Sequence, residues 1–194
     1  MKQEKNVNVS NEEKKNNSLK TAKNIAYIGL FTAVIVVCSF LTIPTTIPFT
    51  LQTFAVFLCL GMLGGKRGLT AICCYVLLGA VGVPVFAGFR GGVGVLLGTT
   101  GGYIMGFILC GIIYLIAEKL FGKSIFVMTI SLIIGAISYF TFGTIWYMIV
   151  YMKNTGPVAL STVLGWCVIP FLLPDAIKLT VAVWLSNKLR GKIK

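Results

Sequence analysis

The feature that most constrains this chain is an almost uncharged stretch that covers most of its length. Between Asn24 and Asn187 only nine residues are charged. The whole 194-residue chain is 57% hydrophobic and 11% charged, whereas a soluble domain carries roughly 25% charged residues. A soluble domain of this size buries only about 70% of the surface that its unfolded chain exposes. We therefore expect an all-α integral membrane protein, with the lipid bilayer as its surroundings.

The remaining charges gather at the two ends of the chain. Residues 1–23 hold six lysines and three glutamates, and four basic residues lie within the last seven. We expect a polar, disordered cytoplasmic tail over 1–23, a six-helix membrane domain over 24–190 and a basic cytoplasmic tail over 191–194. The net charge of +12 does not indicate nucleic acid, because the basic residues lie at predicted helix ends rather than on one soluble face.

Apolar runs bounded by proline and glycine divide the membrane domain into six helices. A membrane-spanning helix needs roughly 20 mainly apolar residues. The second and sixth runs are shorter than the hydrocarbon layer, and the apolar segment 157–173, interrupted by Pro170, is expected to be a half-helix or a re-entrant piece. The expected bundle therefore has irregular extracellular loops. Its helices are 24–41, 51–63, 69–83, 100–117, 125–151 and 174–187.

Six crossings would place both termini on the same side of the membrane. All basic residues except Arg90, Lys153 and Lys178 would then lie on that side. The positive-inside rule makes this side cytoplasmic. We expect a multi-pass protein of the bacterial plasma membrane with both termini in the cytoplasm.

Two irregular segments carry three of the four charged residues of the opposite half, all except Lys153. Residues 79–106 contain ten glycines and Arg90, which indicates either close helix packing or a loop that lines a cavity. An unpaired arginine at membrane depth costs roughly 2.5 kcal/mol or more, which favours a site. Asp175, the only aspartate, follows Pro174 and precedes Lys178 by three residues. It is either a helix cap paired with Lys178 or part of that site.

Other polar and small residues suggest a ligand and a partner. The uncharged segment 42–52 carries four threonines and Gln52, and neutral polar groups of this kind suit a small polar ligand. Ala22/Ala26 and Gly29/Ala33 form i, i+4 pairs that permit close approach of another helix. The partner of this helix is either internal or another protein.

Catalysis and metal binding are not expected. The chain has no histidine, and its single Asp and the one Glu inside the bundle, Glu118, do not form an acid–base pair. The six cysteines lie in apolar runs without metal-ligand spacing, so we interpret them as small buried hydrophobic residues.

Three motifs resemble the BioY family, the biotin-specific S components of energy-coupling-factor (ECF) transporters, over residues 24–190. They are IPFTLQTFAVFL (47–58), LLGAVGVPVFAGFRGGVGVLLGTTGGY (77–103) and PFLLPDAIKLTVA (170–182). The chain departs from the family's usual pattern at Thr99 or Thr100, where proline is usual, and at Pro174, where glycine is common.

The resemblance implies a six-helix protein that captures biotin near its extracellular face. It also implies docking on a transmembrane coupling protein and two cytoplasmic ATPase subunits, which hydrolyse ATP. This chain has no phosphate-binding loop motif of its own, and no cofactor is expected. Matched by motif, the arginine, aspartate and lysine that line or adjoin the biotin pocket are Arg90, Asp175 and Lys178.

The chemistry of biotin agrees with these residue types. Its carboxylate needs Arg or Lys, and its ureido N–H groups need an acceptor such as Asp175 or the Gln52 carbonyl. The sequence does not decide which cation contacts the carboxylate. Two alternative functions also stay open: an S component for another vitamin and a stand-alone transporter. The expected apolar contacts of biotin are Phe49, Tyr75, Phe86 and Tyr103.

Overall fold

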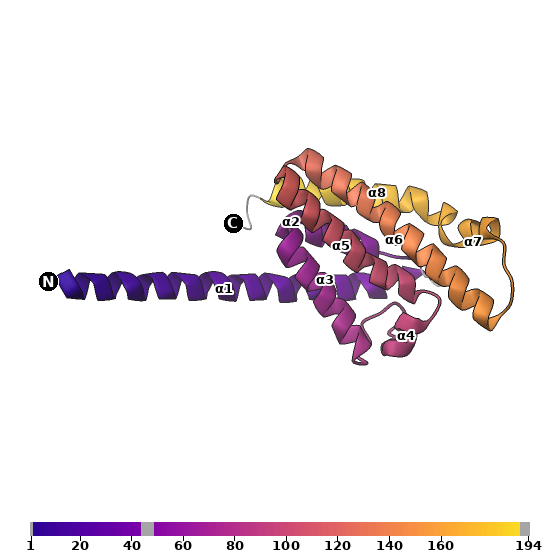
Figure 1. Ribbon diagram of the computed structural model, residues 1–194, viewed down its shortest axis with the longest axis horizontal. Coiled ribbons are helices and arrows are strands. Elements are labelled where there is room, and N and C mark those ends of the chain that lie inside the picture. Colours follow the sequence, from indigo (N-terminus) through magenta and orange to yellow (C-terminus); the bar gives the residue numbers. More distant parts are fainter. Residues whose placement is uncertain (1, 44–48, 191–194) are drawn as a thin grey trace.

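The computed structural model describes residues 2–43 and 49–190, with side chains from Ser18 onward. The described part is a bundle of helices with one small hairpin (Figure 1). The hairpin pairs β1 (Thr42–Ile43) with β2 (Phe49–Thr50) in antiparallel register. The helices are α1 (Lys2–Phe40), α2 (Gln52–Leu63), α3 (Gly65–Ala80), α4 (Val93–Leu97), α5 (Gly101–Phe121), α6 (Ile125–Asn154), α7 (Leu160–Cys167) and α8 (Ile169–Leu189).

Helix α2 forms the centre of the bundle. Every residue from Ala55 to Leu63 is buried, and α2 packs against α1, α3 and α8. Its 12 residues extend over only about 18 Å at 1.5 Å each, less than the roughly 30 Å hydrocarbon layer. Protein rather than lipid surrounds α2, so its shortness exposes little backbone. Gly64 adopts φ +78° and lets α3 begin at the very next residue.

The glycines of α5 and α6 bring these two helices into close contact. A Cβ atom on Gly106 would lie 2.9 Å from the Cα of Tyr139, and one on Gly102 would meet the Trp146 side chain. A Cβ on Gly143 would likewise meet the Tyr103 ring. The packing interpretation of the glycine-rich segment is therefore confirmed for its helical part.

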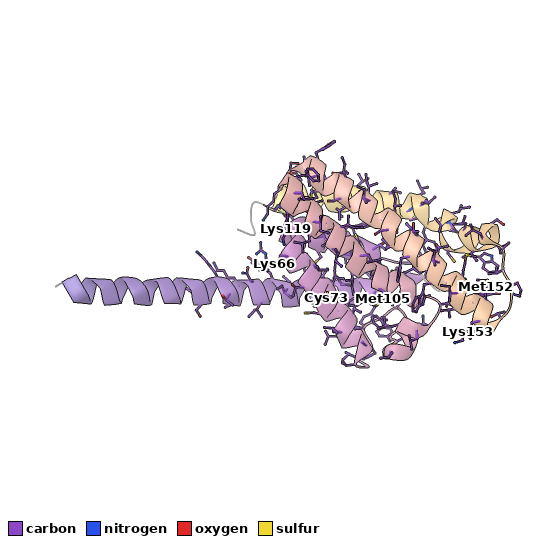
Figure 2. The ribbon with its side chains drawn as sticks, viewed as in Figure 1. Lys66, Cys73, Met105, Lys119, Met152 and Lys153 are labelled. Atoms are coloured by element: carbon purple, nitrogen blue, oxygen red, sulfur yellow. The ribbon has the colours of Figure 1, made fainter. Side chains whose placement is uncertain are left out.

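Among the described residues, four segments are long and apolar enough to cross a membrane: Ser18–Phe40, Gly101–Phe121, Ile125–Asn154 and Leu160–Leu189. The last combines α7 and α8. This finding confirms an all-helical protein with several membrane-capable helices. Lys66 and Lys119 lie at one end of the bundle, whereas Lys153 lies at the other (Figure 2).

Three details differ from the sequence-based expectations. The disorder expected over residues 1–23 is wrong for the described backbone, since α1 is continuous from Lys2 and projects beyond the bundle (Figure 1). The last helix begins at Ile169 rather than Pro174, because Pro170 fits its first turn. Pro174 lies inside α8. The half-helix expected over 157–173 is the short helix α7 followed by the first turns of α8.

The cysteines are less uniformly buried than expected. Cys59, Cys110 and Cys167 are buried, but Cys38, Cys73 and Cys74 are only half-buried. All six are free thiols. The interpretation as buried hydrophobic residues therefore holds for three of them.

Candidate ligand site

A cavity lies among α2, α5, α6 and α8, toward the end of the bundle that carries α4 and α7. Its empty volume is about 680 Å³, including open space at its mouth. Both apolar rings and charged groups face it. The lining includes Gln52, Thr53, Phe86, Arg90, Tyr103, Phe107, Tyr139, Phe171, Asp175 and Lys178.

Asp175 and Lys178 form a buried ion pair on one face of α8. Lys178 Nζ lies 2.8 Å from Asp175 Oδ1, and the two side chains are 9% and 6% exposed. The three-residue spacing places both on the same side of the helix. The helix-cap alternative for Asp175 is wrong, because the N-cap of α8 is Val168. The pairing part of that alternative is confirmed.

All three protons of the Lys178 ammonium have acceptors. Besides Asp175, Nζ donates to the Thr50 carbonyl oxygen at 2.7 Å and to Thr53 Oγ1 at 3.2 Å. The ammonium also lies 4.2 Å from the centre of the Phe49 ring, at a cation–π distance. Lys178 therefore has no spare donor for a ligand in this arrangement.

The Asp175 carboxylate is held from two further helices. Thr53 Oγ1, in the first turn of α2, donates to Oδ1 at 3.1 Å. The Tyr139 hydroxyl, from α6, donates to Oδ2. The two donors and Lys178 compensate the buried carboxylate, while lone pairs of Oδ2 remain for a ligand N–H.

Arg90 occupies a different position, at the mouth of the cavity. Phe86 and Arg90 exchange two backbone hydrogen bonds, of 2.9 and 3.3 Å, around a tight turn in which Gly88 and Phe89 have positive φ. The exposed side chain donates from Nε to the Ala87 carbonyl. Within the described residues Arg90 has no carboxylate partner. No contact joins Arg90 to Asp175 among the described residues, whereas Lys178 contacts Asp175 directly.

The remaining predicted site residues divide into two layers. Gln52, Phe86 and Tyr103 line the cavity, and Tyr103 is hydrogen-bonded to Thr144 at 3.2 Å. Tyr75 does not line the cavity and lies in a second layer, against Gln52 and Phe86. It accepts a 2.9 Å hydrogen bond from Gln52 Nε2 and packs edge-on against Phe86.

Phe49 lies beside the cavity rather than among the residues that line it. Its ring stacks on Phe171, with ring centroids 5.9 Å apart, and covers the Lys178 ammonium. Of the predicted polar segment 42–52, residues 44–48, which include Thr45 and Thr46, lie outside the described residues.

Four further residues that line the cavity were not predicted from the sequence: Tyr139, Thr53, Phe107 and Phe171. Thr53 directly follows Gln52 in the motif 47–58. Its position next to a predicted ligand-binding residue could have identified it. Phe171 also lies in a quoted motif. Tyr139 is one of several polar residues in the long apolar segment of α6, so nothing local distinguishes it. Phe107 lies in an equally apolar part of α5.

The fold defines a multi-pass membrane protein, and its internal cavity is lined by both charged and aromatic side chains. A family model described as the BioY family matches residues 8–194. The chain therefore belongs to the BioY family, and the resemblance noted in the sequence is confirmed.

Relatives of known name agree with this assignment. The chain is 42% identical to the biotin transporter BioY of Thermotoga maritima over 84% of this chain and 92% of that protein. It is 34% identical to a probable biotin transporter BioY of Pyrococcus horikoshii over 88% and 98%. A crystal structure of the S component for biotin from an ECF-type ABC transporter matches with a TM-score of 0.77 and 28% identity, covering 89% and 93%.

Proposed function

We propose that this chain captures biotin in the membrane as the S component of an ECF-type transporter. The single observation that carries the proposal is the cavity in which a compensated Asp175, and an Arg90 with no acidic partner among the described residues, face apolar rings. The relatives named for biotin, in sequence and in structure, supply the identity of the ligand.

The charges in the cavity suggest how biotin is oriented. Arg90 is the cation with free donors, so it is assigned to the carboxylate. Asp175 Oδ2 and Gln52 Oε1 are assigned to the ureido N–H groups, and Phe86, Tyr103 and Phe107 to the apolar thioether ring and alkyl chain. Lys178 is a positioning residue that holds the Asp175 carboxylate in place through their 2.8 Å contact.

The proposed topology has six crossings, made by α1, α2, α3, α5, α6 and α8. The end that carries Lys66 and Lys119 (Figure 2) faces the cytoplasm together with both termini, because it holds most of the basic residues. The cavity then opens toward the extracellular side.

The proposed partner surface is on α1. Ala22, Ala26, Gly29 and Ala33 are all exposed, and a Cβ atom on Gly29 would have no neighbour within 4 Å. This stripe of small residues suits close packing of a helix from the coupling protein. ATP would be hydrolysed by two separate ATPase subunits, and this chain would need neither a cofactor nor catalytic residues.

Titration of biotin into the purified chain, followed by tryptophan fluorescence, tests the proposal. Trp146 Nε1 donates to the Gly98 carbonyl at 2.9 Å, beside the loop that precedes Tyr103, so its emission should respond to occupancy. Saturable binding of biotin, with no binding of thiamine or riboflavin, is expected. Preferential binding of another vitamin would refute the ligand, and biotin uptake by vesicles holding this chain alone would refute the need for partners.

A further inference from the structure

A second hollow lies at the opposite end of the bundle, where α1 passes the turn between α2 and α3 and the turn between α5 and α6. Five cationic side chains line it: Lys20, Lys23, Lys66, Arg67 and Lys123. Lys66 is labelled at this end of the molecule in Figure 2. We propose that this hollow binds the phosphate group of an anionic phospholipid.

The hollow carries a strong excess of positive charge. Glu118 is the one acidic residue among the described side chains that line it, and both of its oxygens are engaged. Oε1 lies 2.9 Å from Arg190 Nη2, and Oε2 accepts the Gly65 N–H at 2.6 Å. Lys123 Nζ lies only loosely near the same carboxylate, at 3.9 Å. Glu118 therefore ties α3, α5 and α8 together and leaves most of the cationic charge uncompensated.

The walls of the hollow are fixed while several of its cations are free. Arg67 Nη1 donates to Asn24 Oδ1 at 3.1 Å, and Arg67 Nε donates to the Leu63 carbonyl. These bonds hold α1 against the start of α3. Within the described side chains, Lys20, Lys23 and Lys66 make no ion pair. Like charges brought together on a fixed frame repel one another, and an anion placed among them relieves that repulsion.

The surroundings favour a lipid over a soluble phosphate. Ile25 on α1 is 65% exposed, and Phe121 and Phe126, which flank Lys123, are 72% and 71% exposed. Cations and apolar surface thus meet at this level of the molecule, as they do for a headgroup and its acyl chains at a membrane interface. Basic pockets between membrane helices bind anionic headgroups in this way.

The test compares two triple variants of the full chain that remove the same charge. Lys20→Gln, Lys23→Gln and Lys66→Gln change the hollow, whereas Lys119→Gln, Lys153→Gln and Lys188→Gln change cations that do not line it. Each purified protein is titrated with phosphatidylglycerol, phosphatidylcholine or inorganic phosphate, and bound ligand is counted by native mass spectrometry. The single variant Lys23→Gln serves if the first triple variant does not fold.

Loss of the three lysines should weaken phosphatidylglycerol binding about a hundredfold, given roughly 1 kcal/mol for each basic residue near an anionic membrane. The single variant should weaken it about fivefold. The control triple variant should bind like the original chain, and phosphatidylcholine should bind weakly to all. Equal phosphatidylglycerol binding by both triple variants would overturn the site. Saturable binding of inorganic phosphate without binding of phosphatidylglycerol would show that the hollow binds a soluble phosphate and not a lipid.

Discussion

At the scale of single residues, the decisive group is the Asp175 carboxylate. It belongs to a buried residue and accepts hydrogen bonds from Thr53, Tyr139 and Lys178. Asp175→Asn replaces an acceptor by a donor and leaves the Lys178 ammonium without its counter-charge. Breaking a buried pair in this way costs about 3–5 kcal/mol, so biotin affinity should fall by at least about a hundredfold.

The measurement for Asp175→Asn is a biotin titration together with a melting curve. Thr180→Val is a matched control, because Thr180 lies on the same helix and is hydrogen-bonded only to the Ala176 carbonyl of its own turn in the described structure. Near-original affinity in Asp175→Asn would show that the carboxylate does not contact the ligand.

Arg90 permits a test of ligand orientation. Its guanidinium is exposed and has no acidic partner within the described residues, so Arg90→Ala should leave the fold intact. If it binds the biotin carboxylate, the variant loses a charged hydrogen bond of about 1.5–3 kcal/mol, and affinity falls roughly tenfold or more. Arg90→Lys should recover only part of it, because lysine lacks the bidentate fork.

Comparison with carboxyl-amidated biotin isolates the contact made by Arg90. The amide should bind the original chain and Arg90→Ala with similar affinity, since it offers no carboxylate to either. An equal loss for biotin and for the amide would assign Arg90 a role other than carboxylate binding.

At the scale of elements, α1 carries the proposed partner surface. Gly29 and Ala33 are exposed, so replacing both by leucine should hinder close approach of the coupling protein. Recovery of the complex in a pull-down should fall sharply, while biotin binding by the isolated chain stays unchanged. Gly165→Leu on α7 is the control, because a Cβ there also meets nothing within 4 Å. An undiminished complex in the double variant would exclude this face of α1.

The contact between α5 and α6 can be tested through Gly106. A Cβ atom there would lie 2.8 Å from the Tyr139 Cβ and 2.9 Å from its Cα, so neither atom can move aside without shifting α6. Overpacking of this kind costs about 1–3 kcal/mol. Gly106→Ala should lower the melting temperature by several degrees, whereas Gly165→Ala, which meets open space, should not. Equal melting temperatures would mean that the two helices separate easily.

At the scale of the whole molecule, the proposed topology predicts which end faces the cytoplasm. Lys119 and Lys153 are exposed and lie at opposite ends of the bundle (Figure 2). In intact cells a membrane-impermeant maleimide should label Lys153→Cys, and it should label Lys119→Cys only after permeabilisation. The six native cysteines are first replaced by serine or alanine. Labelling of both positions from outside would contradict the six-crossing arrangement.

The sequence by itself determined the class of this protein and the kind of site it contains. Composition fixes the surroundings, because a chain with nine charges between Asn24 and Asn187 cannot be stable in water. Proline and glycine delimit the helices, and the ends of α2, α5 and α6 were predicted to within four residues. The family resemblance followed from contiguous motifs, which need no knowledge of tertiary contacts.

Only the tertiary structure decided how the site residues are paired. Tyr139 and Thr53 are 36 and 122 positions from Asp175 in the sequence, and their hydrogen bonds depend on the rotation of α6 and α2 about their axes. The same packing pairs Lys178 with Asp175 and leaves Arg90, at the mouth, without an acidic partner among the described residues. It also places Tyr75 behind Gln52. Helix rotation follows from how buried side chains and glycines fit between neighbouring helices, a property of all the helices together that no single segment encodes.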